Sequence, residues 1–203
     1  ANVTILLALK GFALYSTFEL CKKYLKGCCA SGLNEALLAK EEFKGEIHTY
    51  SPAFKPDEFG KISQISNHII FNSFSQYDLY KNKLKPHNSV GLRINPECST
   101  IDIDLYNPCA INSRLGITKK EFEKKNFLPK KIEGFHFHAL CEQNVDDLEL
   151  VLEKFEKNFS HYFKGLQWIN FGGGHHITRK DYEVNRLISL LRNFKLKYPH
   201  LNI

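Results

Sequence analysis

The chain passes from strand to turn most sharply at Trp168-Ile169-Asn170-Phe171-Gly172-Gly173-Gly174-His175-His176. Apolar residues lead into three consecutive glycines, and a helical pattern follows over 180–198. Three glycines let the backbone approach a ligand closely and point successive N–H groups at it. Before a helix N-terminus such a turn is suited to cradle a phosphate group, although a merely flexible turn has the same sequence. The residues at the other strand ends help to decide between a phosphate-binding turn and a flexible one.

The same order of strand and then helix recurs outward from this stretch along the whole chain. Strands are predicted at 5–10, 28–31, 46–50, 68–72, 89–95, 132–139 and 168–171, and Leu201 opens an eighth. Helices are predicted at 17–26, 34–43, 56–66, 75–84, 119–125, 145–163 and 180–198, with Ser75 as the N-cap of the fourth. This alternation favours a parallel sheet, and eight units without a GxGxxG after the first strand favour a barrel over an open sheet. We predict the α/β class, with a TIM-like (β/α)8 barrel truncated in its eighth strand.

The composition is that of a globular protein with a modest positive charge. At 203 residues, of which 43% are hydrophobic, the chain is able to bury a full core, and its formal charge is +6. The lysines are densest at Lys119-Lys120, Lys124-Lys125 and Lys130-Lys131, which is typical of a solvated surface rather than of a nucleic-acid groove. The balance also suits an anionic cofactor or substrate. We therefore expect a small-molecule ligand and no nucleic acid.

The cysteine spacing and the hydropathy of the sequence indicate the cellular compartment of the protein. The six cysteines show neither paired CxxC spacing nor a dense disulfide framework, which indicates a reducing cytosol. No apolar run reaches about 18 residues, so we expect a cytoplasmic protein without a membrane partner. The chain opens at Ala1 directly into a strand, ends as another strand begins, and contains no Met. We expect it to be a fragment.

Function in such a barrel lies at the C-terminal ends of the strands. The first predicted strand ends in Lys10, which alternation places opposite the bulkier Leu7 and Leu9 and therefore in the barrel mouth. A desolvated lysine becomes neutral and is able to form a Schiff base, although a strand-end lysine also simply reaches to solvent in many proteins. Arg93 lies between two apolar residues and should face inward, where it needs an acceptor in a site or in a structural salt bridge.

The sixth strand end is the richest in polar groups. Its sequence is Gly134-Phe135-His136-Phe137-His138-Ala139-Leu140-Cys141-Glu142-Gln143. Period-two alternation sends His136 and His138 to one face and the two phenylalanines to the other. Two chemistries fit these residues. One is a metal site in which His136, His138, His175 or His176 joins Cys141 or Glu142.

The other chemistry is a pyridoxal 5'-phosphate (PLP) site. Here Lys10 holds the aldehyde, a histidine stacks on the ring and the glycines hold the phosphate. The metal interpretation leaves Lys10 and the glycines without a role, whereas the PLP interpretation uses every group. We therefore favour PLP and expect no metal ion.

Several segments, in chain order, resemble the fold-type III PLP-dependent decarboxylases, the group of ornithine and diaminopimelate decarboxylases. Within it the closest likeness is to the branch acting on carboxylated polyamines, the carboxynorspermidine (carboxyspermidine) decarboxylases. The segments are Leu7-Ala8-Leu9-Lys10, Ala30-Ser31-Gly32-Leu33-Asn34-Glu35, Asp104-Leu105-Tyr106-Asn107-Pro108-Cys109, Ser113-Arg114-Leu115-Gly116, His136-Phe137-His138-Ala139-Leu140-Cys141-Glu142 and Phe171-Gly172-Gly173-Gly174-His175-His176-Ile177-Thr178. The last two are the most specific.

The resemblance implies a barrel of the alanine-racemase type that spans 1–203 and binds PLP. It implies that Lys10 is the Schiff-base lysine and, with His138, a catalytic residue, His138 stacking on the pyridine ring. The implied cofactor-binding residues are Lys10, Arg93, His138, Cys141, Gly172, Gly173 and Gly174. The implied substrate-side residues are His136, Glu142 and His176. The implied reaction is decarboxylation of carboxynorspermidine or carboxyspermidine to norspermidine or spermidine, in a homodimer with shared active sites.

The chain also departs from the family pattern. The family has a carboxylate on the pyridine nitrogen and an Arg on the phosphate at the end of strand eight, and this chain stops before them at Ile203. The family's C-terminal β-domain is absent as well, so the implied function belongs to the parent protein. Three alternatives stay open: another decarboxylase of the group, acting on diaminopimelate or ornithine; a non-catalytic regulatory homologue; and a metallohydrolase.

Overall fold

The computed structural model describes residues 2–101, 103–125 and 127–203, which form two compact units. We call Thr4–Leu92 the N-terminal unit. We call Arg93–Ile203, with the short segment 2–3, the C-terminal unit. Each unit is built from parallel strands that alternate with helices, as the sequence predicts.

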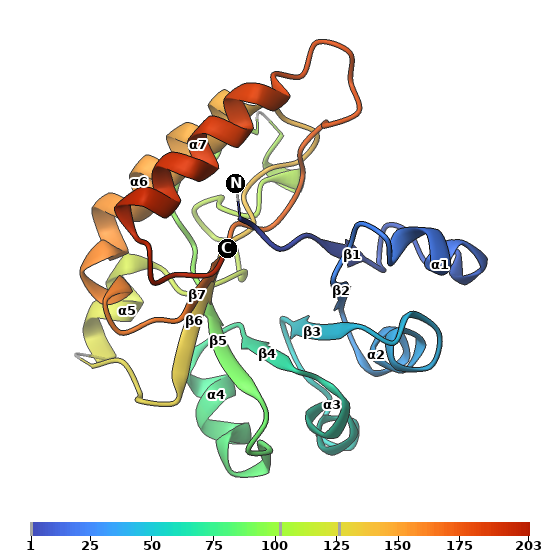
Figure 1. Cartoon of the computed structure of the whole chain (residues 1–203). Helices are drawn as coiled ribbons and strands as arrows, with labels where there is room; N and C mark the ends of the chain where they lie inside the picture. The colour runs from blue at the N-terminus through green and yellow to red at the C-terminus, as the bar shows by residue number, and fades with distance from the viewer. Residues whose placement is uncertain (1, 102, 126) are drawn as a thin grey trace. The chain divides into compact units, whose positions relative to one another are not determined.

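The N-terminal unit is a parallel sheet in which β1 to β5 pair in chain order. Figure 1 shows α1 to α4 along one side of this sheet. The last residue of β5 falls in the C-terminal unit. The elements are β1 (Leu6–Ala8), α1 (Phe18–Cys21), β2 (Gly27–Ala30), α2 (Leu33–Leu38), β3 (Glu46–Ser51), α3 (Phe59–Ile65), β4 (His68–Phe71), α4 (Phe74–Tyr80) and β5 (Ser89–Arg93), with 3-10 helices at Tyr15–Thr17 and Lys81–Lys83 and a π-helical turn at Ala39–Phe43.

The core of this unit gathers apolar side chains from the strands and from the helices that cover them. Leu9, Cys28 and Ile47 pack in one cluster with Phe18 and Phe43. Alternate strand positions point to the opposite face, as period-two geometry requires. The sheet therefore has an apolar face under the helices and a second face that carries polar residues of β3 and β4.

The C-terminal unit pairs β6 with β7 in parallel and packs three helices with them. Helices α6 and α7 lie side by side (Figure 1). A capping box at Asn144 and Asp147 fixes the start of α6. Asn202 forms a parallel bridge to Trp168, so the predicted eighth strand opens beside β7. The elements are α5 (Lys119–Lys125), β6 (Ile132–His136), α6 (Val145–Phe163), β7 (Trp168–Asn170) and α7 (Val184–Lys197), with a 3-10 turn at Asp104–Tyr106.

Phenylalanines form the core between β6 and α6. Phe135 and Phe137 are fully buried and contact Phe155 of α6, with ring centroids 6.5 and 4.9 Å apart. Phe137 also stacks on Phe171, at 5.4 Å. The predicted alternation of the sixth strand is thus confirmed, because its phenylalanines lie on the helix side.

Three local predictions are wrong. The N-cap of α4 is Ser73, whose hydroxyl accepts the Gln76 N–H at 3.1 Å, and not Ser75. The last helix begins at Val184 rather than at 180, so a loop separates the glycine turn from its N-terminus. A helix over 17–26 is also reduced to the single turn of α1. Among the residues that the structure describes, no helix combines the length and apolarity needed to cross a bilayer.

Candidate active site

The three glycines after β7 differ in what holds them. Gly172 and Gly174 have left-handed backbones, with φ of +72° and +95°. A Cβ at Gly174 would lie 2.1 Å from the Leu140 carbonyl oxygen, and one at Gly172 would lie 2.5 Å from the Phe137 carbonyl oxygen. A Cβ at Gly173 would meet no atom within 4 Å. Two glycines are therefore required by close packing on the neighbouring segment, and the middle one borders open space.

His138 lies directly beside this turn. Its Nδ1 accepts the Gly173 N–H at 3.2 Å, so a neutral His138 carries its proton on Nε2. The buried Arg93, only 5% exposed, donates from its guanidinium to the His138 carbonyl oxygen at 3.3 Å. The acceptor that the sequence demanded for Arg93 is thus the backbone of the histidine segment. Arg93 and the glycine turn hold His138 from two sides.

His136 is held by a residue that sequence reasoning missed, Asn170. The Asn170 side-chain oxygen accepts from His136 Nδ1 at 3.2 Å and from the Gly172 N–H at 2.7 Å. Burial, followed by the Arg93 charge, lowers the pKa of His136 well below its usual range, so this imidazole stays neutral at neutral pH. Asn170 lies two residues before Gly172, and the same alternation that predicted His136 could have revealed it.

The segments after β6 and β7 run together as a pair. The Gln143 N–H donates to the Gly174 carbonyl at 2.9 Å, and the His176 N–H donates to the Gln143 carbonyl at 3.1 Å. Gln143 and His175 form a parallel bridge. Cys141 and Glu142 are exposed where the first of these segments turns, and Glu142 has a left-handed φ of +56°. We call residues 138–143 and 171–176 the loop pair.

A further polar set, also missed from the sequence, anchors the loop pair. Tyr182, which is 6% exposed, places its hydroxyl 2.7 Å from His175 Nδ1. Burial lowers the pKa of His175. The Gln143 amide contacts Thr100, and the Arg179 guanidinium contacts Asn144. No motif marks these residues, because each acts through a contact that no local sequence pattern specifies.

Lys10 belongs to the N-terminal unit. It follows β1 on an exposed turn, while the preceding Leu9 is 3% exposed and packs in the core. The predicted alternation is confirmed there, because Leu9 faces the helices and Lys10 does not. Burial raises the pKa of the Cys29 thiol to about 11, and the nearby Lys10 ammonium opposes this rise. Each predicted site residue is thus at a strand end or in a loop that follows one.

The metal alternative named His136, His138, His175 and His176 as candidate ligands. Among the described residues, the three-residue group with converging ligand atoms is Glu46, His48 and His68 of the N-terminal unit, far along the sequence from the loop pair. His136 and His138 instead use Nδ1 for Asn170 and for the Gly173 N–H.

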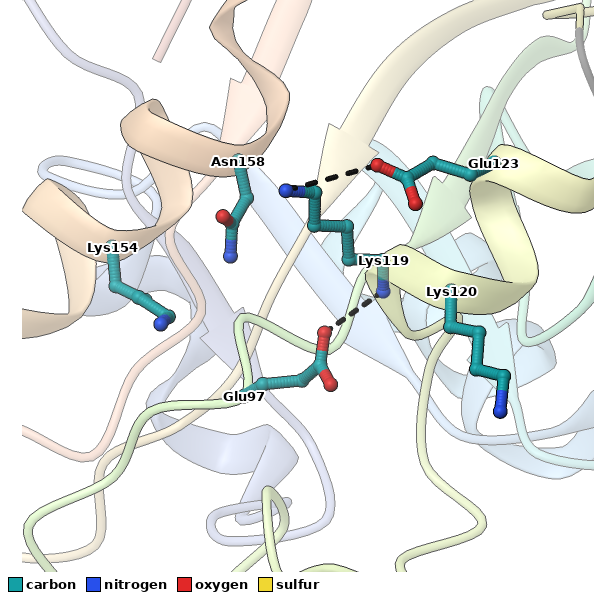
Figure 2. A pocket seen from close by; sticks show the side chains of 6 residues that line it. All are labelled: Glu97, Lys119, Lys120, Glu123, Lys154 and Asn158. Carbon is teal, nitrogen blue, oxygen red and sulfur yellow. Dashed lines mark hydrogen bonds and ion pairs between the residues drawn. The ribbon is translucent and has the colours of Figure 1, made fainter.

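A charged cavity of about 350 Å³ in the C-terminal unit lies elsewhere. Its lining carries both positive and negative side chains, and no predicted site residue contributes to it (Figure 2). Lys119 pairs with Glu123 at 3.7 Å and donates its backbone N–H to Glu97 at 2.9 Å. The lining residues are Glu97, Lys119, Lys120, Glu123, Lys154 and Asn158.

Curated relatives match the chain over nearly all its length. A Campylobacter jejuni protein named carboxynorspermidine/carboxyspermidine decarboxylase is 52% identical over 198 residues, which are 98% of this chain and 51% of the relative. A Synechocystis protein named carboxyaminopropylagmatine decarboxylase is 42% identical over 204 residues, 100% of this chain and 52% of the relative. The chain is a homologue of the carboxynorspermidine/carboxyspermidine decarboxylases. It spans about half the length of the curated relatives it matches. No protein-family model matches it.

Solved structures agree with this homology. The crystal structure of carboxynorspermidine decarboxylase from Campylobacter jejuni, complexed with norspermidine, has a TM-score of 0.89 at 49% identity, covering 98% of this chain and 51% of that one. Diaminopimelate decarboxylase from Helicobacter pylori, complexed with L-lysine, has a TM-score of 0.76 at 15% identity, covering 100% and 56%. The resemblance and the fold class predicted from the sequence are therefore confirmed: α/β, matching part of the barrel of these decarboxylases.

Proposed function

We propose that the protein decarboxylates carboxynorspermidine or carboxyspermidine, with PLP as cofactor, and so produces norspermidine or spermidine in polyamine biosynthesis. The observation that carries the proposal is the open space at Gly173 beside a fixed His138, on a chain 52% identical to a decarboxylase of that name. The site residues below are proposed on the same basis.

The residues present fit PLP in three respects. Gly173 leaves room for a phosphate next to a turn of backbone amides, which bind anions without a side chain. Because α7 begins only at Val184, no helix N-terminus would bind the phosphate. The Gly172 and Gly173 N–H groups already donate to Asn170 and His138, so the phosphate would bind the following amides, those of Gly174 and His175. Lys10 offers an exposed amine at a strand end for the aldehyde. His138 offers an aromatic face that two contacts keep in place.

When bound, PLP supplies an electron sink for the pair that remains on the α-carbon as CO2 leaves. Lys10 would bind the aldehyde between turnovers and yield it to the substrate amine. His138 would pack against the ring, with its tautomer set by the Gly173 N–H. Arg93 would act through the His138 backbone, and Cys141 would lie beside the cofactor on the exposed part of the loop pair.

The substrate-side residues fit a polycation. Glu142 presents an exposed carboxylate at the tip of the loop pair, where it would pair with an ammonium group of the substrate. His176, bound through its backbone to Gln143, would lie next to it. His136 is bonded to Asn170, so we propose that it supports Gly172 rather than meeting the substrate itself. We further propose a cytoplasmic homodimer with shared active sites, as the family resemblance implies.

A second substrate, carboxyaminopropylagmatine, is favoured by one observation. The Synechocystis relative named for it is 42% identical over the whole chain. Diaminopimelate has weaker support, because the diaminopimelate decarboxylase from Helicobacter pylori is only 15% identical. The carboxylated polyamines and carboxyaminopropylagmatine share one chemical feature. Each is an amino acid whose side chain carries further positive charge.

The test uses the full-length protein. We expect a visible absorbance band that borohydride removes, with the reduced adduct mapped by mass spectrometry to Lys10. In decarboxylation assays we expect turnover of carboxynorspermidine, carboxyspermidine or carboxyaminopropylagmatine to exceed that of diaminopimelate and ornithine. An adduct on another lysine, or no chromophore, would contradict the PLP site. Preferential turnover of diaminopimelate or ornithine would contradict the substrate class alone.

A further inference from the structure

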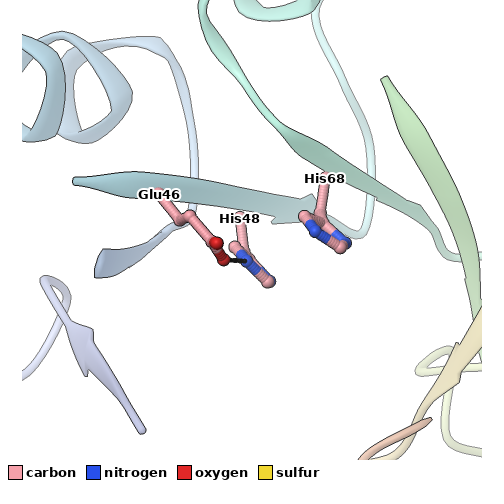
Figure 3. A group of neighbouring side chains, drawn as sticks. All are labelled: Glu46, His48 and His68. Carbon is pink, nitrogen blue, oxygen red and sulfur yellow. Dashed lines mark hydrogen bonds and ion pairs between the residues drawn. The ribbon is translucent and has the colours of Figure 1, made fainter. Parts of the chain in front are cut away.

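Two histidines and a glutamate meet on the polar face of the sheet in the N-terminal unit. His48 and His68 are direct register partners on the neighbouring strands β3 and β4. Glu46 precedes His48 by two residues and so shares its face. The three side chains project from the sheet side by side (Figure 3), and one ligand atom from each lies within 4.8 Å of the others.

One pair of these atoms already has the spacing of two ligands around one metal ion. The Glu46 Oε2 lies 3.2 Å from His48 Nε2. Ligand bonds of about 2.0–2.2 Å at tetrahedral angles would place two ligand atoms roughly 3.4 Å apart. The other carboxylate oxygen, Oε1, receives the Lys26 ammonium at 2.8 Å. Lys26 therefore orients the carboxylate and leaves Oε2 on the histidine side, as an outer partner of a metal ligand does.

The protonation states of His68 and Glu46 suit metal binding. Burial, and then the charge of His48, lowers the pKa of His68 to about 3, so its ring is neutral and has a lone pair at neutral pH. The hydrogen bond from His48 and the Lys26 ammonium lower the pKa of Glu46 to about 2, against desolvation, so its carboxylate is ionised. One negative charge faces two imidazoles that stack 3.9 Å apart at 13°.

We propose that Glu46, His48 and His68 bind one Zn²⁺ ion, with a water molecule in the fourth position. Two imidazoles and a carboxylate form a donor set that zinc uses, and they disfavour Mg²⁺ and Ca²⁺, which take oxygen ligands. Stacked rings do not aim at a common point, so one ring turns about χ2 on binding. That torsion is broad and permits the movement. The ion would tie β3 to β4, in a place that the decarboxylase proposal does not use.

The experiment is a zinc titration of the full-length protein after removal of metal with EDTA. Elemental analysis after gel filtration should find one zinc ion per chain, and zinc should raise the melting temperature. His48→Gln and His68→Gln should each weaken zinc binding by roughly tenfold or more, since each removes a direct ligand. His87→Gln, at an exposed position of the same unit, is the matched control and should bind zinc as the unmodified protein does. Mg²⁺ should neither bind nor stabilise.

Circular dichroism of the metal-free variants separates lost binding from lost folding, and Glu46→Gln adds a variant that keeps the shape and loses the charge. Co²⁺ replaces Zn²⁺ as a spectroscopic probe. An absorption spectrum of nitrogen and oxygen ligands, lost in His48→Gln, supports the site. Thiolate charge-transfer bands, zinc retained by folded His48→Gln and His68→Gln variants, or the absence of stoichiometric zinc would each overturn it. Decarboxylase turnover is not a readout, so the outcome is independent of the proposed function.

Discussion

The turn after β1 and the loop pair after β6 and β7 both follow strand ends, but they are built in opposite ways. Lys10 lies on an exposed turn, and the buried Leu9 beside it is the anchor. In the loop pair, His138 is held by Arg93 and Gly173, and the backbone pairs Gln143 with Gly174. The Lys10 amine is exposed and lies outside the core, whereas the groups of the loop pair are held by several contacts. An exchange of binding partners at an amine needs the former, and a rigid cofactor cradle needs the latter.

The largest effect is expected for Lys10→Ala, in the exposed turn after β1. We expect turnover to fall by roughly 10³-fold or more, the scale seen when a covalent catalytic group is removed. Stability should hardly change, because the side chain is exposed and lies outside the core. Stopped-flow assays and thermal melts on the same preparation separate the two effects. Lys23→Ala, at another exposed lysine of the same unit, is the control for charge and should retain turnover. Equal losses in both variants would refute a specific role for Lys10.

In the loop pair, Gly174 and Gly173 should respond differently to substitution by alanine. Gly174→Ala should destabilise the protein by about 2–4 kcal/mol, because a left-handed alanine and a Cβ 2.1 Å from the Leu140 carbonyl oxygen both cost energy. Gly173→Ala should change stability by only about 0.5 kcal/mol, since its Cβ meets nothing within 4 Å. It should instead weaken PLP binding by roughly 10- to 100-fold, by filling the proposed phosphate space.

Urea denaturation measures the first quantity and fluorescence titration with PLP the second. If Gly173→Ala bound PLP normally, the phosphate would have to lie elsewhere. If both variants lost stability equally, the division of the run into packing and binding glycines would be wrong.

The sequence predicted more of the site than of its supports. Alternation along 132–139 placed His136 and His138 opposite the phenylalanines, because a strand with one apolar face leaves no other choice. The same argument could not reveal why position 174 must be glycine. A Cβ there would clash with the carbonyl oxygen of Leu140, which belongs to another segment. The cluster of Glu46, His48 and His68 also depends on the register of β3 against β4, which no local pattern specifies.

His68 of β4 should make the N-terminal unit sensitive to acid. The pKa of His68 falls from its usual value of 6.5 to about 3 on folding, chiefly through burial. The unfolded chain therefore binds the proton more strongly than the folded one between these values, and stability is lost as the pH falls from about 6.5 towards 3. The loss is on the order of a few kcal/mol at most.

The measurement is urea denaturation at several pH values in the presence of EDTA, so that no metal contributes. In His68→Gln the slope of stability against pH should flatten in this window, because glutamine does not titrate. His87→Gln, at an exposed position, should keep the slope of the unmodified protein. An unchanged slope in His68→Gln would show that other groups control the acid sensitivity.

The last prediction concerns the contact that joins His136 to the glycine turn. Asn170→Ala removes the acceptor of both the His136 Nδ1–H and the Gly172 N–H, and should cost about 1–3 kcal/mol because these donors lose a protein partner. If His136 acts through Asn170, then Asn170→Ala and His136→Ala should raise the KM for PLP together, and the double variant should be no worse than the worse single one. Additive losses would instead mean that His136 meets the substrate on its own. In that case kcat for the polyamine substrate would fall in His136→Ala but not in Asn170→Ala.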